Sequence, residues 1–288
     1  LTGTAFISSG LIIVSGQKDA LAMTQVSDSY DPRFFEPLFA VEDKHFWFRA
    51  RNKAIGGLVR GLAQQFQPGY RVLEIGCGTG NTLRQLEQTC AGGTVLGMDL
   101  FHEGLRYAQH RVSCPLIQGD MDSPPFGAQF DLIGLFDVLE HLPDDTKALR
   151  VLYRMLKPNG YLMLTVPAHM SLWSYFDEAS HHCRRYEYTE LKNKLDRAGY
   201  RIEYLTPYMA SIFPLVWLGR RVAALLSGTR HSSREHARQM ASRDMRITPV
   251  LNEVLMFILS LEAHRLAKRR RLPIGTSLLA LARKAENV

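Results

Sequence analysis

The stretch Val72-Leu-Glu-Ile-Gly-Cys-Gly-Thr-Gly80 decides the fold of this chain. A short strand-like run leads into a turn in which Gly76, Gly78 and Gly80 occupy three of five positions. Because glycine has no side chain, the backbone of such a turn can approach a ligand closely. Thr79 or Asn81 can begin the helix that follows. The stretch therefore predicts a strand, a loop and a helix that together hold a nucleotide cofactor.

The spacing of the glycines indicates which cofactor binds. A dinucleotide loop of the form G-x-G-x-x-G needs glycine at position 81, where this chain has Asn81. Glu74 would repel a pyrophosphate, but it can reach an ammonium group through water or backbone amides. S-adenosylmethionine (SAM) carries an ammonium group and no phosphate. The loop thus favours SAM over a dinucleotide.

Acidic residues recur at the ends of the next two predicted strands. Asp99 ends a strand that begins at Thr94, and it is placed to accept hydrogen bonds from both hydroxyls of a ribose. Asp120 follows a third short strand and could accept from an adenine amino group, with Met121 beside it to pack on the ring. A fourth strand is predicted over 130–136, and a helix end, a Pro/Gly turn and a fifth strand over 155–166.

Taken in this order, the motifs resemble the class I SAM-dependent methyltransferases, in particular the broad group that includes the ubiquinone and menaquinone type, over roughly residues 45 to 206. The resemblance implies an α/β fold, a Rossmann-like doubly wound sheet of seven strands in the order 3-2-1-4-5-7-6. It implies SAM as cofactor and no metal. It assigns the cofactor site to Glu74, Gly76, Cys77, Gly78, Gly80, Asp99, Leu100, Asp120, Met121, Phe136 and Asp137.

Other functions stay open at this point. A glycine turn without cofactor, an NAD(P)-dependent oxidoreductase and a non-catalytic SAM-binding or interaction protein are the alternatives, since a fold does not prove turnover. The run Ser123-Pro-Pro-Phe126 resembles a signature of DNA and RNA amino-methylating enzymes, but it precedes the fourth strand instead of following it. We therefore expect no nucleic acid substrate.

Composition indicates one α/β domain with additions. The chain has 288 residues, 46% of them hydrophobic. Its four cysteines, at positions 77, 90, 114 and 183, lack paired or metal-ligand spacing, which favours a reducing, cytoplasmic location. No apolar run reaches the roughly 18 residues that span a bilayer. Residues 1–22 precede Met23, which is a candidate natural start, and we expect them to be disordered or loosely packed.

Four parts are predicted along the chain: 1–40, a partly disordered extension; 41–206, the SAM-binding core with its N-terminal helix; 207–272, a basic helical insertion or lid between the last two strands; and 273–288, the final strand and tail. Within 219–288, fourteen Lys and Arg face five Asp and Glu. Two apolar helices, at 209–218 and 250–261, have basic flanks. They suit an anionic membrane surface, on the inner membrane face, or a lid over a lipid-like substrate; a subdomain packed on the sheet is the alternative.

The same resemblance implies that the methyl acceptor approaches segments after the fourth and fifth strands and an N-terminal helix. The candidates for catalysis are His141, His169, His182 and Tyr186. The candidates for substrate binding are His45, Trp47, Trp173, Asp177, His181, Arg184 and Arg185. Each histidine could equally be structural, and the two arginines could pair with Asp177 and Glu187 instead of an acidic substrate group.

The acceptor is expected to be a small molecule, a lipid-linked compound or a glycan. The segments around His45 and His182 resemble those of bacterial and archaeal methyltransferases that are often associated with envelope glycan or lipid-linked sugar pathways. Cys183 departs from that pattern, which has an aromatic residue there.

Overall fold

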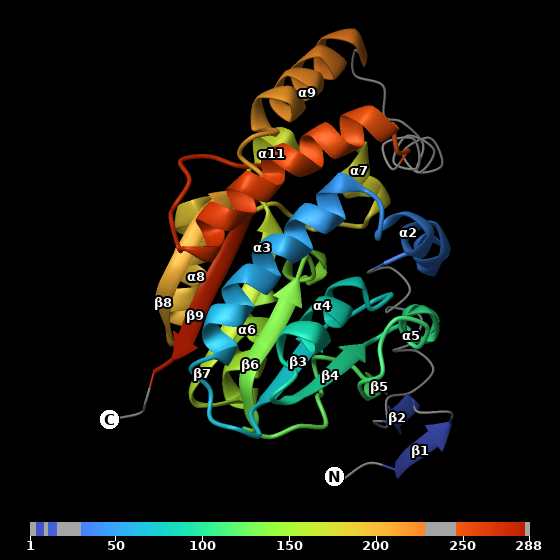
Figure 1. Cartoon of the computed structure of the whole chain (residues 1–288), viewed down its shortest axis with the longest axis vertical. Helices are drawn as coiled ribbons and strands as arrows, with labels where there is room; N and C mark the ends of the chain where they lie inside the picture. Colours follow the sequence, from blue (N-terminus) through green and yellow to red (C-terminus); the bar gives the residue numbers. More distant parts are fainter. Residues whose placement is uncertain (1–3, 9–10, 16–29, 228–245, 286–288) are drawn as a thin grey trace.

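A computed structural model describes residues 4–8, 11–15, 30–227 and 246–285. It contains a single mixed sheet with helices on both faces (Figure 1). The strands of its main part are β3 (Arg71–Ile75), β4 (Thr94–Asp99), β5 (Leu116–Gln118), β6 (Phe130–Phe136), β7 (Leu156–Pro167), β8 (Tyr200–Tyr208) and β9 (Ser277–Lys284). Their order is β5-β4-β3-β6-β7-β9-β8, which confirms the predicted order 3-2-1-4-5-7-6.

Two further strands extend this sheet beyond the seven that the sequence predicts. β1 (Thr4–Ser8) and β2 (Leu11–Ser15) pair antiparallel, and β2 runs parallel to β5 at the edge of the sheet. The sheet of the described residues thus has nine strands. Met23, the candidate start, lies outside the described residues.

Parallel pairing brings the predicted loops to one edge of the sheet. β3 lies between β4 and β6 and pairs parallel with both, so the loops after these strands meet at their carboxyl ends. Among the seven strands of the main part, β9 runs antiparallel to its neighbours β7 and β8. The central strands are buried almost throughout, as expected for a sheet covered on both faces.

Helices cover both faces of the sheet with separate apolar layers. One layer contains residues of α3 (Phe46–Ala63), α4 (Asn81–Thr89) and α5 (His102–Ala108), and the other those of α6 (Asp145–Met155) and α8 (Tyr188–Arg197). Shorter elements lie in the loops at the carboxyl edge: η1 (Pro32–Phe34), α2 (Phe35–Val41), η2 (Leu139–His141), η3 (Met170–Leu172) and α7 (Tyr175–Ala179). The run 123–126 lies in the loop between β5 and β6.

The insertion between β8 and β9 is docked on the core through its second helix. It holds α9 (Phe213–Ser227) and α11 (Pro249–Ala267), and both are longer than the sequence predicts. In Figure 1, α11 lies along α3. Leu259, Ala263 and Leu266 join the apolar layer of α3. A Cβ added at Gly57 of α3 would come 2.8 Å from Ala267 Cβ, so the two helices approach closely.

Asn252 fixes the start of α11 against the start of α3. Its buried side chain accepts a hydrogen bond from Phe46 N (2.8 Å) and donates one to Lys44 O (3.0 Å). Buried backbone groups that lose such partners destabilise the folded state.

We predict that Asn252→Ala lowers the free energy of unfolding by about 1–3 kcal/mol, because two part-buried backbone groups lose their hydrogen-bond partner. His264→Ala, at an exposed position on the same helix, is the matched control. Urea unfolding of both variants measures the difference. Equal, small changes would mean that the insertion is not held by Asn252.

Candidate functional site

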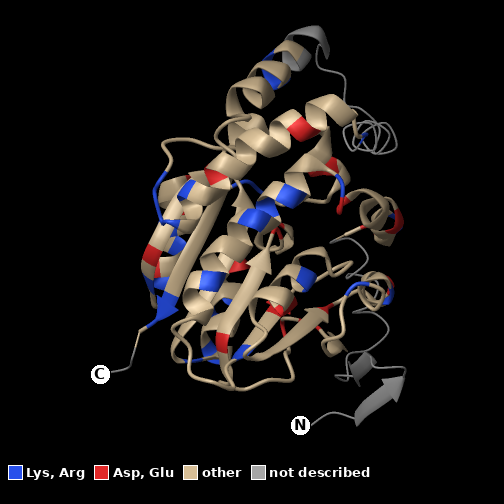
Figure 2. Cartoon of the chain, viewed as in Figure 1, with Lys and Arg blue, Asp and Glu red and all other residues tan. Residues whose placement is uncertain are grey.

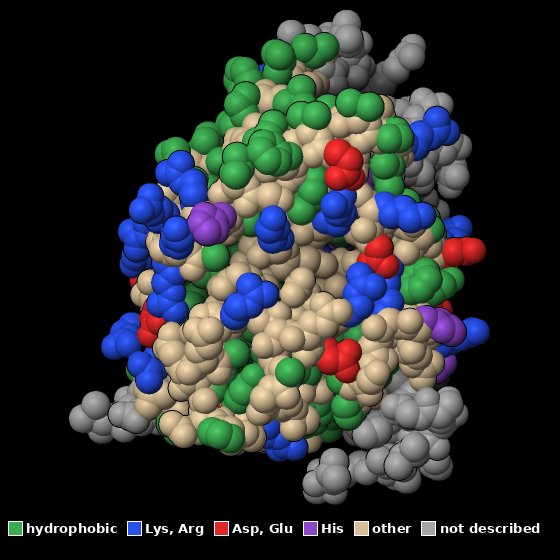
Figure 3. All heavy atoms as spheres, viewed as in Figure 1, with side chains coloured by type: hydrophobic (Ala, Val, Ile, Leu, Met, Phe, Trp, Pro, Cys, Tyr) green, Lys and Arg blue, Asp and Glu red, His purple; other side chains and the backbone are tan. Residues whose placement is uncertain are grey.

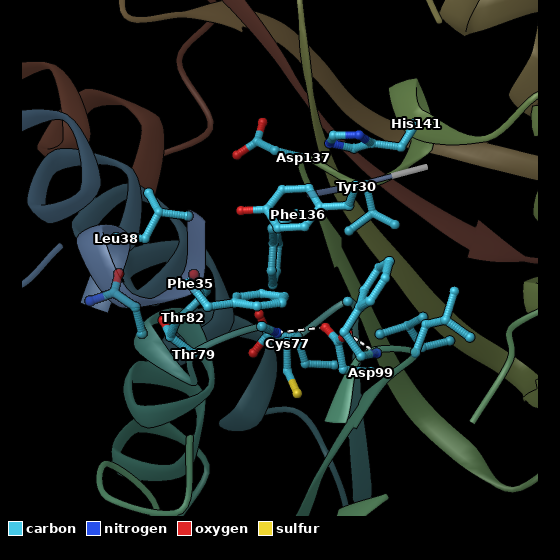
Figure 4. A pocket seen from close by; sticks show the side chains of 18 of the residues that line it. Tyr30, Phe35, Leu38, Cys77, Thr79, Thr82, Asp99, Phe136, Asp137 and His141 are labelled. Carbon is cyan, nitrogen blue, oxygen red and sulfur yellow. Dashed lines mark hydrogen bonds between the residues drawn. The ribbon is translucent and has the colours of Figure 1, made fainter. Parts of the chain in front are cut away.

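A cavity of about 250 Å³ opens at the carboxyl ends of the central strands. Figure 4 shows Asp99 and Cys77 at one end of it and Asp137 and His141 at the other. Its lining includes ten of the eleven residues assigned to the cofactor: Glu74, Gly76, Cys77, Gly78, Asp99, Leu100, Asp120, Met121, Phe136 and Asp137. Residues from strands far apart in the chain therefore share one cavity.

The glycine loop is built so that backbone forms the cavity wall. Gly76 has a φ of 71° and Gly78 a φ of 49°, values that favour glycine. A Cβ on Gly76 would lie only 2.3 Å from Val138 Cγ2. Gly80 does not line the cavity. It precedes α4 with a φ of 78° and packs against Ala108, so its place is structural.

Asp99 ties the glycine loop to the next loop. Its Oδ2 accepts from Gly78 N (2.7 Å) and its Oδ1 accepts from Phe101 N (2.8 Å). The side chain is buried, and burial raises its pKa to about 6. Each carboxylate oxygen can accept a further hydrogen bond, which is what a ribose hydroxyl would donate.

Glu74 has a buried carboxylate oxygen that no described residue contacts by a hydrogen bond. The residue is 2% exposed, and its Oε2 has no hydrogen-bond partner among the described residues. Burial raises its pKa well above the ordinary value, with Arg51 acting in the opposite direction. A buried carboxylate of this kind favours a positively charged ligand group. This buried acceptor therefore fits the ammonium group of SAM, which donates hydrogen bonds.

One wall of the cavity comes from α3. Arg51 donates to Asp137 Oδ2 (2.7 Å) and to Thr82 Oγ1 (2.9 Å), and its guanidinium lies 5.0 Å from the centre of the Trp47 ring. Phe48 and Arg51 line the cavity, whereas Trp47 does not. The sequence pointed to this segment through His45 and Trp47, whereas the side chains that line the cavity are those of Phe48 and Arg51. A spacing of three residues places 48 and 51 on one helix face, and this signal could have found them.

An aromatic cover closes the cavity on the N-terminal side. The Tyr30 ring centre lies 5.1 Å from that of Phe35 and 5.9 Å from that of Phe101. All three residues line the cavity, and Figure 4 shows Tyr30 and Phe35 facing into it. Sequence reasoning missed them. Phe101 follows the acidic strand end directly, but nothing in the sequence places residues 30–35 above it.

Of the residues assigned to the acceptor, only His141 lines this cavity. His182 lies directly behind it, with the two ring centres 4.7 Å apart. The remaining candidates lie outside the lining: His45, Trp47, His169, Trp173, Asp177, His181, Arg184, Arg185 and Tyr186.

Several of these residues have structural contacts. His45 caps α3 by accepting from Trp47 N (3.3 Å). His169 Nδ1 lies 3.0 Å from Glu187 Oε2. His181 has a φ of 57°, and Trp173 ends the short helix η3. These positions favour roles in shaping the loops.

The arginines after β7 are held in ion pairs. Arg185 binds Asp177 through Nε (2.7 Å) and Nη2 (3.0 Å), the pairing that the sequence offered as an alternative. Arg184 pairs instead with Asp145 (2.9 Å). Tyr186 is completely buried, and its hydroxyl donates to Asp145 Oδ2 (2.8 Å). Its burial favours a structural role over catalysis.

Comparison with known proteins agrees with this geometry. Residues 46–205 match a family model described as a methyltransferase domain. The chain belongs to the class I SAM-dependent methyltransferase family. SAM is the cofactor of this family, and Glu74, the glycine loop and Asp99 fit it.

The curated relatives cover part of the chain. It is 32% identical over 104 residues to the ubiquinone biosynthesis O-methyltransferase of Pseudomonas entomophila (strain L48), covering 34% of this chain and 44% of that protein. It is 33% identical over 141 residues to the trans-aconitate 2-methyltransferase of Deinococcus radiodurans, covering 48% of this chain and 51% of the relative. The chain thus spans about half the length of these relatives.

Solved structures share the fold. A SAM-dependent methyltransferase from Thermotoga maritima has a TM-score of 0.52 at 15% identity, over 91% of this chain and 99% of that one. A Haloferax volcanii methyltransferase solved in complex with the Trm112 activator gives 0.53 at 18% identity, over 86% and 99%.

We predict that SAM binding weakens as the pH falls through 6. Ribose hydroxyls would donate to the ionised form of Asp99, so a bound ligand lowers the pKa of this carboxyl group and binding is weaker where the group is protonated. With a pKa of about 6 in the free protein, affinity at pH 5 should be about tenfold lower than at pH 7.5. Calorimetry across this range measures it.

Asp99→Asn should weaken SAM binding at pH 7.5 by about tenfold or more and flatten the pH dependence. Asp196→Asn, an exposed position on α8, is the control. A wild-type affinity that does not change between pH 5 and 7.5 would contradict the assignment of Asp99.

Proposed function

We propose that this protein transfers a methyl group from SAM to an oxygen of a lipid-linked or otherwise apolar small-molecule acceptor. The observation that carries the proposal is one cavity that joins the SAM-fitting residues at one end to His141 at the other. An NAD(P)-dependent oxidoreductase is disfavoured by the buried Glu74 beside the glycine loop.

The residues of the chain can perform three tasks in this reaction. SAM supplies a methyl group on a positively charged sulfur. Glu74 would hold the ammonium group of the cofactor and Asp99 its ribose, and the aromatic cover of Tyr30, Phe35 and Phe101 would exclude water. An oxygen acceptor must also lose its proton, and the imidazole of His141 at the far wall can accept it.

An apolar surface on the insertion supports an apolar acceptor. On α11, Val250 is 79%, Phe257 67% and Leu261 58% exposed, and on α9, Leu215 is 61% exposed. Trp217, Leu218, Val222, Leu251, Val254 and Ile258 complete the set. We call these ten residues the apolar patch. Figure 3 shows hydrophobic side chains gathered over α9 and α11. Such an exposed patch marks a contact surface.

Basic residues border the apolar patch. Lys268, Arg269, Arg270 and Arg271 are exposed in the loop after α11, and Figure 2 shows this loop rich in Lys and Arg. Arg220 and Arg221 lie on α9. None of the helices in the described part of the chain is long and apolar enough to cross a membrane. An apolar face with basic flanks suits attachment to an anionic lipid surface.

We therefore place the protein in the cytoplasm, at the inner face of the membrane, with a lipid-linked acceptor. Two relatives support this proposal by name: the ubiquinone biosynthesis enzyme above and a phthiotriol/phenolphthiotriol dimycocerosates methyltransferase of Mycobacterium ulcerans, 32% identical over 101 residues. The trans-aconitate enzyme supports the second candidate, a water-soluble acid as acceptor.

The acceptor class is tested with methyl-labelled SAM. The protein is incubated with cell extract, and aqueous and lipid fractions are separated. We predict that label enters the lipid fraction with wild-type protein and not with Asp99→Asn. Label in the aqueous fraction alone would favour the second candidate, and no transfer to any fraction would favour a non-catalytic SAM-binding protein.

Membrane attachment is tested by co-sedimentation with liposomes that contain anionic lipid. Each basic residue near such a surface contributes about 1 kcal/mol, screened by salt, whereas apolar insertion is insensitive to salt. We predict that replacing Lys268, Arg269, Arg270 and Arg271 by Gln weakens binding mainly at low salt. Phe257→Ser with Leu261→Ser should weaken it at all salt concentrations.

The matched control replaces four exposed basic residues on the other face of the sheet, Arg150, Arg154, Lys192 and Arg197, by Gln. Equal loss in this control would reveal a non-specific charge effect. Absence of binding by the wild-type protein would leave the insertion as a lid over the core.

A further inference from the structure

Three potential metal ligands meet beside the cavity. Glu140 and His141 lie on η2, and His182 lies in the segment between α7 and α8. One ligand atom from each lies within 4.8 Å of the other two. The His141 and His182 rings meet edge to face at 85°. Because His141 lines the cavity, this cluster forms part of its wall.

Glu140 is the unexplained member of the cluster. It is completely buried, and neither carboxylate oxygen has a hydrogen-bond partner among the described residues. The nearest basic nitrogen is His182 Nε2, 3.9 Å from Oε1, which is too far for a hydrogen bond. Such a carboxyl group calls for a positive charge close to it.

His182 is oriented to supply a ligand atom. Its Nδ1 lies 2.9 Å from Asp177 Oδ1. Asp177 is itself buried and also accepts two hydrogen bonds from Arg185. A hydrogen on Nδ1 therefore points to Asp177, and the lone pair of Nε2 faces Glu140. A carboxylate that orients a histidine in this way is the usual arrangement behind a metal ligand.

Charge favours a cation at this point. Two buried carboxyl groups, those of Glu140 and Asp177, share this region with Arg185, which binds Asp177. Asp137 is paired with Arg51. The three ligands would be two imidazole nitrogens and one carboxylate oxygen, a set that suits first-row transition metals better than Mg²⁺ or Ca²⁺.

We propose that Glu140, His141 and His182 bind a divalent transition-metal cation, of the Zn²⁺ or Mn²⁺ type, at the wall of the cavity, with Asp177 as the positioning residue for His182. Three protein ligands leave coordination positions for an oxygen of the acceptor. The site deepens the proposed methyl transfer, because a bound cation makes a hydroxyl group more acidic. The sequence led us to expect no metal. The proposed ligands come from two segments about forty residues apart, so no short ligand spacing marks the site.

The test is calorimetric titration of the full chain, freed of metal by a chelator, with Zn²⁺, Mn²⁺ and Mg²⁺. It is done in the Cys183→Ser background, because Cys183 is exposed and its Sγ lies 3.5 Å from His141 O. We expect one equivalent of Zn²⁺ or Mn²⁺ to bind more tightly than Mg²⁺. Glu140→Gln and His182→Ala should each weaken this binding at least tenfold.

Glu178→Gln, an exposed carboxylate on α7, is the matched control and should bind the metal like the parent protein. Circular dichroism and SAM affinity show that each variant is folded. Absence of saturable binding by the parent protein, or equal affinity in Glu140→Gln, overturns the proposal. Metal binding is measured without methyl transfer, so a protein that binds metal here but methylates nothing would overturn the proposed function alone.

Discussion

The two hydrogen bonds accepted by Asp99 connect the parts of the cofactor site. One comes from Gly78 in the loop after β3, and the other from Phe101 after β4. The carboxylate thereby sets the spacing between two neighbouring loops. On one side it holds Gly78 of the glycine loop, and on the other it holds Phe101, a residue of the aromatic cover. Its burial is the reason that its pKa rises to about 6, so the same contact that orders the loops also makes the site sensitive to pH.

A second buried carboxylate organises the opposite wall. Asp177 receives Arg185, His182 and the backbone of Ser174, which begins α7. Arg185, His182 and Asp177 were candidates for the acceptor site, but they contact one another instead. These contacts also place His182 against His141. Asp177 and Glu140 differ in one respect, because Asp177 is surrounded by donors and Glu140 is not. Glu140 is therefore the buried carboxyl group of this region that lacks a hydrogen-bond partner among the described residues.

The insertion illustrates how one helix can serve two surfaces. α11 buries Leu259, Ala263 and Leu266 against α3 and exposes Val250, Phe257 and Leu261. The polar residue Asn252 fixes its register by hydrogen bonds to the backbone that begins α3. Since α3 also carries Arg51 and Phe48 in the cavity wall, the apolar patch and the cavity are attached to the same helix.

The sequence by itself determined the glycine loop and the acids at the strand ends, and its resemblance to the class I methyltransferases implied the sheet order. These features are local: a strand, its turn and the first residues beyond it are consecutive in the chain, and parallel pairing brings consecutive units to one edge. Ten of the eleven residues assigned to the cofactor line the cavity for this reason. Gly80 differs because its φ and its contact with Ala108 serve the packing of α4.

Only the tertiary structure decided which polar side chains line the cavity. Arg184, Arg185, Tyr186 and Asp177 have the residue types of a substrate site, yet their contacts lie within the protein, with Asp145 or with one another. The cluster of Glu140, His141 and His182, and the cover formed by Tyr30, Phe35 and Phe101, join segments that no sequence period relates. Whether a buried charge finds its partner depends on side chains contributed by distant segments, and that pairing exists only once the chain has folded.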